Sequence, residues 1–105
     1  MKALILAALL VATGTNAAVV ESTTNKAGGM LIATDEAVPA CGAGWWLFLS
    51  TKPTGEILRG CWQLSYLGVH VWYDDHTEYT YPVKGWVDGP AAAAFFAQPQ
   101  SAPNS

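Results

Sequence analysis

The chain has 105 residues and a formal net charge of −3, with five basic and eight acidic side chains. This length limits it to a single domain. Binding to nucleic acid or to an anionic membrane requires clustered basic side chains. The sequence contains no such cluster, so we exclude both as partners.

Residues 1–18 have the pattern of a signal peptide. Lys2 supplies a positive charge, residues 3–12 form an apolar run, and Thr15 and Ala17 are small residues before a cleavage point. The apolar run is much shorter than the roughly 20 residues that span a membrane. We therefore expect export to the periplasm or the medium, with cleavage after Ala17 or Ala18 and membrane contact only through the export signal.

Cys41 and Cys61 are the two cysteines of the chain. In an exported protein, two cysteines predict one disulfide. A closed loop of about 20 residues would stabilise the fold by about 3 kcal/mol. Free thiols or an intermolecular bridge are the alternative interpretation.

Residues 19–88 alternate in hydrophobicity between turn signals, which predicts an all-β domain. We predict a small antiparallel β-meander or open barrel of about five strands. The expected strands are Met30–Thr34, Trp45–Thr51, Glu56–Leu64, Val69–Tyr73 and Glu78–Tyr81, with a further short strand within Val83–Asp88. Residues 19–25 are interpreted as either a first strand or a flexible arm.

Residues 89–105 are rich in Ala and Pro and contain no charged side chain. This composition predicts a disordered tail. Within it, residues 91–97 have an alternative interpretation as a helical turn that docks Phe95 and Phe96.

Aromatic residues are dense between positions 45 and 86, where ten occur. Such a small core does not easily bury all of them. We assign Trp62 and Leu47 to the core. Trp46, Tyr66 and Trp72 are the candidate binding residues, because exposed aromatic side chains are preferred anchors at interfaces. The alternative is that these rings only cover the outer face of the sheet.

The densest polar set lies near one predicted turn and contains His70, Asp74, His76 and Glu78. Imidazole and carboxylate groups are metal ligands, so one hypothesis is a metal-dependent hydrolase. A solvated turn is the simpler interpretation and the one we favour. Since no motif joins a nucleophile to a base, we expect neither an enzyme nor a cofactor nor a bound metal.

Several short motifs together resemble a family of small exported proteins encoded mainly by tailed phages and proteobacterial prophages. The similarity covers about residues 1–82. The motifs are Asn25–Gly29 (NKAGG), Thr34–Glu36 (TDE), Cys41, Gly60–Trp62 (GCW), Val71–Trp72 and Tyr81–Pro82. The resemblance implies that Cys41 pairs with Cys61 and that Gly28 and Gly29 meet backbone requirements. It implies no activity, and the Ala/Pro tail has no counterpart in the family.

These observations lead to one main functional hypothesis. The protein would be a non-enzymatic, phage- or prophage-type exported protein that binds an envelope protein or glycan and modulates the host envelope. The alternatives are an inhibitor or ligand of cell-wall enzymes or glycans, and a structural protein. The oligomeric state is left open.

Overall fold

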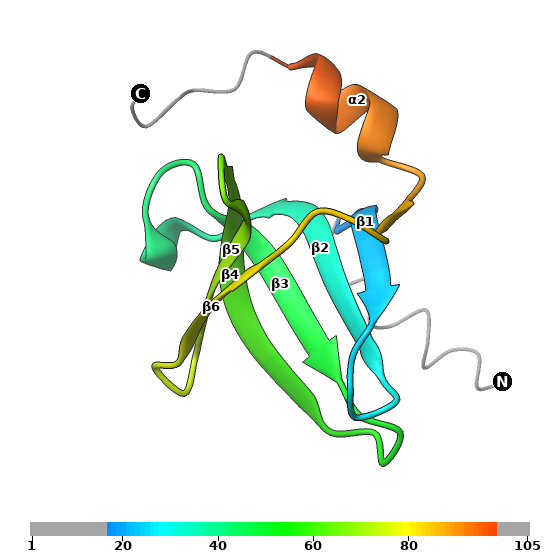
Figure 1. The fold of residues 1–105 in the computed structure, drawn as a ribbon. Coiled ribbons are helices and arrows are strands. Elements are labelled where there is room, and N and C mark those ends of the chain that lie inside the picture. The colour runs from blue at the N-terminus through cyan, green and yellow to red at the C-terminus, as the bar shows by residue number, and fades with distance from the viewer. Residues whose placement is uncertain (1–16, 99–105) are drawn as a thin grey trace, which may run out of the picture.

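The computed structural model describes residues 17–98, which form an antiparallel sheet curled into a half-barrel (Figure 1). The spatial order of the strands is β6-β5-β4-β3-β2-β1-β7. The strands are β1 (Val19–Thr24), β2 (Met30–Ala37), β3 (Trp46–Thr51), β4 (Ile57–Ser65), β5 (Gly68–Tyr73), β6 (Glu78–Tyr81) and β7 (Val87–Asp88). Most of the predicted signal peptide, residues 1–16, and the end of the predicted tail, residues 99–105, lie outside the described residues.

The all-β antiparallel prediction is confirmed, but the predicted number of strands is wrong. The sheet has seven strands rather than about five. Residues 19–24 form a full strand, and β7 adds a two-residue strand beside it, pairing Asp88 with Glu21 and Val87 with Ser22. β7 lies within Val83–Asp88, where we predicted a further short strand, and β1 lies within residues 19–25, which we interpreted as either a strand or an arm. A two-residue strand carries no alternation of its own, so the sequence does not predict which strand β7 pairs with.

The connection between β6 and β7 makes the topology more than a simple meander. Because β6 and β7 lie at opposite edges of the sheet, residues 82–86 must cross from one edge to the other (Figure 1). We call residues 82–86 the strap. Trp86 of the strap packs against Phe48, with ring centroids 6.3 Å apart, which places the strap on the concave face of the curled sheet.

Glycines allow two close backbone approaches in the half-barrel. A Cβ at Gly60 would lie 2.6 Å from the carbonyl oxygen of Trp72, so only glycine lets β4 and β5 approach this closely. A Cβ at Gly29 would lie 1.9 Å from the carbonyl oxygen of Thr51. The turn before β2 can therefore rest directly against the end of β3.

The register divides the sheet into a concave and a convex face. Trp46 pairs with Trp62, and Trp62 pairs with Val71, so these three side chains share the concave face. Cys61 and Trp72 also form a pair, on the convex face. The core lies on the concave face, where Trp62, Phe48 and Val71 are almost completely buried.

One end of the concave face is filled by the short helix α2 (Ala92–Ala97), seen at the top of Figure 1. Phe95 of this helix is 3% exposed, and its ring centroid lies 5.3 Å from those of both Trp46 and Trp62. Residues 92–97 are therefore an ordered helix rather than part of a disordered tail. A six-residue helix is too short to be stable alone, so its docking onto the core stabilises it.

A buried hydrogen-bond network supports the same end. The indole Nε1 of Trp62 donates to the carbonyl oxygen of Thr34 at 2.8 Å. The Thr34 hydroxyl in turn donates to the carbonyl oxygen of Leu47 at 2.9 Å. Trp62 and Leu47 are both buried, as we predicted from the sequence, but only Trp62 belongs to the concave core, because Leu47 lies on the convex face opposite Cys61.

The predicted disulfide is present between Cys41 and Cys61, whose Cα atoms lie 6.5 Å apart. Cys41 closes the 3-10 helix η1 (Pro39–Cys41) just before β3, while Cys61 lies in the middle of β4. The bond therefore fastens the loop before β3 to the convex face of the sheet.

Candidate functional site

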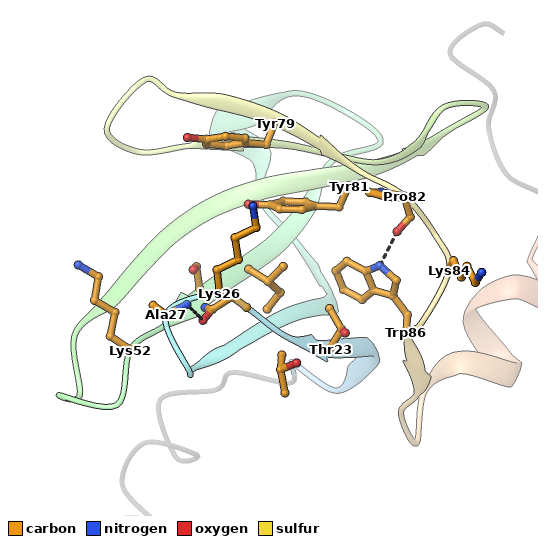
Figure 2. Close-up of a pocket in the computed structure, with 13 residues that line it drawn as sticks. Thr23, Lys26, Ala27, Lys52, Tyr79, Tyr81, Pro82, Lys84 and Trp86 are labelled. Atoms are coloured by element: carbon orange, nitrogen blue, oxygen red, sulfur yellow. Dashed lines mark hydrogen bonds between the residues drawn. The ribbon is translucent and has the colours of Figure 1, made fainter.

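The other end of the concave face is open, and it contains a hollow of about 710 Å³. We call it the open hollow. It lies between the turns that follow β1 and β3, the strand β6 and the strap (Figure 2). Its lining comprises Thr23, Thr24, Asn25, Lys26, Ala27, Leu31, Ser50, Lys52, Tyr79, Tyr81, Pro82, Lys84 and Trp86. This volume is typical of a small-ligand site.

Three aromatic rings form one wall of the open hollow (Figure 2). Tyr79 and Tyr81 are alternate residues of β6, so both point to the concave face. Their rings are stacked, with centroids 5.8 Å apart and an interplanar angle of 24°. Trp86 lies 6.4 Å from Tyr81 and is oriented by its Nε1, which donates to the carbonyl oxygen of Pro82 at 2.7 Å. The wall is thus preformed by contacts among the rings themselves.

A chain of hydroxyl groups lies below this wall. The hydroxyls of Tyr73 and Tyr81 are hydrogen-bonded at 2.8 Å, and Ser50 hydrogen-bonds Tyr73. Burial raises the pKa of Tyr73 and of Tyr81 above the ordinary tyrosine range, and the hydrogen bond to Tyr81 raises the Tyr73 value further. Both phenols therefore stay neutral at physiological pH, as hydrogen-bonding groups without charge.

Three lysines surround the open hollow. Lys26 and Lys52 lie in the two turns opposite the aromatic wall, and Lys84 lies on the strap (Figure 2). All three are exposed. The amino group of Lys52 also contacts the carboxylate of Glu56 at 3.3 Å, in an exposed pair that we expect to be weak.

The turn that carries Lys26 is held in place by Asn25. The side-chain oxygen of Asn25 accepts from the backbone N–H groups of Gly29 at 2.8 Å and Ala27 at 3.1 Å. Its amide nitrogen donates to the carbonyl oxygen of Thr51 at 2.9 Å. Asn25 thereby fixes this turn against the end of β3, next to Lys52.

A carboxyl pair lies behind the strap, where β7 meets β1. Glu21 and Asp88 are direct register partners and hydrogen-bond through their side chains. The pKa of Glu21 is raised from 4.5 to about 7, first by burial and then by the hydrogen bond and negative charge of Asp88. Both residues line a smaller hollow of about 300 Å³ that shares Trp86 with the open hollow.

The structure does not bring the three predicted binding residues together. Trp46 is half-buried on the concave face against Phe95, while Trp72 is half-exposed on the convex face. Tyr66 is 96% exposed in the turn between β4 and β5. They therefore do not form the single aromatic face that we expected. Successive side chains of a strand point to opposite faces of the sheet, and the pairing of β3, β4 and β5 places Trp46 and Trp72 on different faces. Trp72 instead lines a separate hollow of about 300 Å³.

The four residues considered for metal binding separate into two groups. His70 and Glu78 are neighbours on the convex face, with Nε2 and Oε2 2.7 Å apart, and the other His70 ring nitrogen meets the Thr80 hydroxyl at 2.9 Å. Asp74 and His76 lie in the following turn. Within residues 17–98, no three His, Cys, Asp or Glu side chains converge as a metal site would require.

Sequence reasoning missed the open hollow. A partial signal existed, since Tyr79 and Tyr81 alternate with polar residues and must share a face. Lys26, Lys52 and Lys84 are 26 and 32 positions apart in the chain, so nothing in the sequence shows them as one group. Only the curl of the sheet and the crossing of the strap bring them around these rings.

Comparison with protein-family models, curated proteins and solved structures finds no match to this chain. In the part of the chain that the structure describes, none of the helices is long and apolar enough to cross a membrane.

Proposed function

We propose that this is an exported, non-enzymatic protein of phage or prophage type that binds a component of the cell envelope. The observation that carries this proposal is the open hollow, which has a preformed aromatic wall and a size suited to a small ligand or to the end of a larger one. Tyr79 is 53% exposed, although it lies beside a core in which Phe48 and Tyr73 are buried. Such a ring is available for contact with a partner.

The disulfide supports the exported location of the proposal. Cys41 is exposed, so the bond can be formed and reached from solvent. Bonds of this kind persist in the periplasm and outside the cell but are rare in the reducing cytosol. The signal-peptide pattern of residues 1–18 points to the same compartment.

The test is retention of the purified, disulfide-bonded protein on separated envelope fractions, namely sacculi, outer membranes and immobilised periplasmic extract. We expect one fraction to retain the wild type and the Tyr66→Ala variant equally well. The Tyr79→Ala variant should not be retained by that fraction. The two tyrosines are matched, since both are exposed, but Tyr66 lies outside the open hollow.

Two results would contradict the proposal. If none of the three fractions retains the wild type, the envelope-binding function is wrong. If Tyr66→Ala abolishes retention and Tyr79→Ala does not, the partner binds the β4–β5 turn and the open hollow is not the site. Circular dichroism of each variant checks that the fold is intact.

A further inference from the structure

Positive charge in this acidic protein is concentrated at one place. Residues 17–98 contain four lysine and arginine side chains, and three of them, all lysines, line the open hollow. The same range contains eight Asp and Glu residues, and none of them is among the lining residues. A local positive site on a negatively charged molecule attracts anions selectively.

The aromatic wall adds a second requirement to the ligand. Tyr79 and Trp86 offer flat apolar surfaces beside the lysines, and an anion alone would leave these surfaces uncovered. A sugar ring has an apolar face of C–H groups and an edge of hydroxyl groups. The first suits the faces of the rings, and the second suits the Tyr81 hydroxyl, which is held by its hydrogen bond to Tyr73.

We propose that the open hollow binds an acidic saccharide, a sugar that carries a carboxylate or a phosphate, with its sugar rings along the wall of Tyr79, Tyr81 and Trp86 and its charge at the lysines that line the hollow. This inference rests on the proposed function and names the chemistry of the partner. Lysine suits this role because its ammonium group is a flexible point charge that can follow either type of anion. Lys52 supplies a further cation once it leaves its exposed contact with Glu56.

The same observations argue against a nucleic acid strand as the ligand. Base stacking on aromatic rings with lysines nearby occurs in proteins that bind single strands, but these proteins have a positive groove that follows the backbone. Here the positive charge ends at the rim of a hollow of about 710 Å³, and the chain as a whole is negative. The site therefore suits a short acidic ligand or the end of a chain.

The experiment is isothermal titration calorimetry on the full exported protein with its disulfide intact. The probes are trigalacturonate with neutral α-1,4-galactotriose as its matched control, mannose 6-phosphate with mannose as its control, inorganic phosphate, and an oligothymidylate. We expect at least one acidic sugar to bind about tenfold more tightly than its neutral control, since charged hydrogen bonds are lost in the latter. Binding should weaken as salt is added.

Matched variants show which side chains contribute to the affinity for the acidic sugar. Lys26→Gln and Lys84→Gln should each weaken binding of the acidic sugar about tenfold. Arg59→Gln removes an exposed cation that lies outside the open hollow and should leave binding unchanged. Tyr79→Ala should abolish binding of acidic and neutral sugars alike.

The outcomes that overturn the inference are distinct from failure of the proposed function. Equal affinity for acidic and neutral sugars, inorganic phosphate binding as tightly as the acidic sugars, or tighter binding of the oligothymidylate would each refute the acidic-saccharide assignment. If no sugar binds but an envelope fraction still retains the protein through Tyr79, this inference fails and the proposed function stands. If the sugars bind but no envelope fraction does, the site is correct and the envelope role is wrong.

Discussion

The two ends of the concave face are built from similar residues but differ in what covers them. At the closed end, Trp46 and Trp62 are covered by Phe95 of α2. At the open end, Tyr79 and Tyr81 pack on Tyr73 and Phe48, and the strap with its Trp86 lies beside them. Both ends are aromatic, so aromatic content does not identify the site. The presence or absence of a covering segment distinguishes them.

Charge follows the same division. Lys26, Lys52 and Lys84 line the open hollow. The rings in contact at the closed end are apolar, and the charged residues of the smaller hollow that Trp62 lines, Glu21 and Asp88, are acidic. We therefore expect the closed end to contribute to stability, and we propose that the open end contributes to binding. The predictions below test whether the two roles are separate, beginning with the largest expected effect.

Removing the Phe95 ring, which covers the closed end, should lower the free energy of unfolding more than any other change. Phe95→Ala empties a buried site between two tryptophans, and we expect it to lower the free energy of unfolding by about 4 kcal/mol. Urea denaturation followed by tryptophan fluorescence measures this change. Phe96→Ala is the control, because Phe96 is 43% exposed and should matter little. Equal effects of the two changes would show that α2 does not stabilise the core.

Removing the disulfide should have the next largest effect. The bond closes a loop with a sequence separation of 20, and the double variant Cys41→Ser with Cys61→Ser should lose about 3 kcal/mol. Urea denaturation of the oxidised wild type and of the double variant gives the comparison. A variant as stable as the wild type would mean that the concave core alone maintains the fold.

Replacing the buried Trp62 should lower the free energy of unfolding more than replacing the half-exposed Trp72. Trp62→Phe leaves the carbonyl oxygen of Thr34 without its indole donor and should cost about 2 kcal/mol. Trp72→Phe, on the half-exposed convex side, should change the free energy of unfolding by less than about 0.5 kcal/mol. A larger loss of stability for Trp72→Phe than for Trp62→Phe would contradict the division of the sheet into a buried concave face and a more exposed convex face.

The carboxyl pair behind the strap should make stability depend on pH. The pKa of Glu21 rises from 4.5 to about 7 on folding, so the folded state binds more protons than the unfolded state between these values. The free energy of unfolding should therefore fall as pH increases from 4.5 to 7, by about 1 kcal/mol after allowance for solvent screening.

Glu21→Gln isolates this contribution. The variant should lack this part of the decrease, so that the difference in stability between variant and wild type grows from pH 4.5 to 7. Thermal melts across this range measure it. A constant difference over the whole range would show that Glu21 keeps an ordinary pKa and that the Asp88 contact is unimportant.

The smallest effects on stability should come from the open end. Lys26→Gln and Lys84→Gln change exposed side chains, so each should alter the free energy of unfolding by less than about 0.5 kcal/mol while weakening binding of acidic sugars. Denaturation and calorimetry on the same preparations test both parts. A large loss of stability in either variant would show that the open end also maintains the fold.

Much of the fold could be predicted from local patterns. The strand Glu78–Tyr81 has the predicted bounds, β3 and β5 differ from the predicted ranges by one residue at one end, and β4 differs by one residue at each end. Alternation and turn residues are local properties, so they can be recognised without the fold. The interpretation of residues 89–105 as a disordered tail is wrong for residues 92–97, where the alternative of a docked helical turn is confirmed. Their order depends on a contact between Phe95 and residues of β3 and β4, which a local pattern does not show.

The candidate site could not be predicted in the same way. We chose Trp46, Tyr66 and Trp72 for their residue type, and the register separates them. Exposure is a property of the packed molecule, so it cannot be inferred from the identity of a ring. The sequence shows that the lysines are too few and too scattered to bind nucleic acid. It does not show that three of them line one hollow of the folded protein.

The sequence by itself determined the all-β class, the antiparallel pairing of successive strands and the Cys41–Cys61 pair, because these follow from periodicity, turn chemistry and cysteine count. Tertiary structure alone decided which end of the concave face is filled and which stays open. That outcome depends on the strap crossing between the two edges of the sheet and on Phe95 docking at one end. Both are contacts between residues far apart in the chain, for which a local pattern carries no signal.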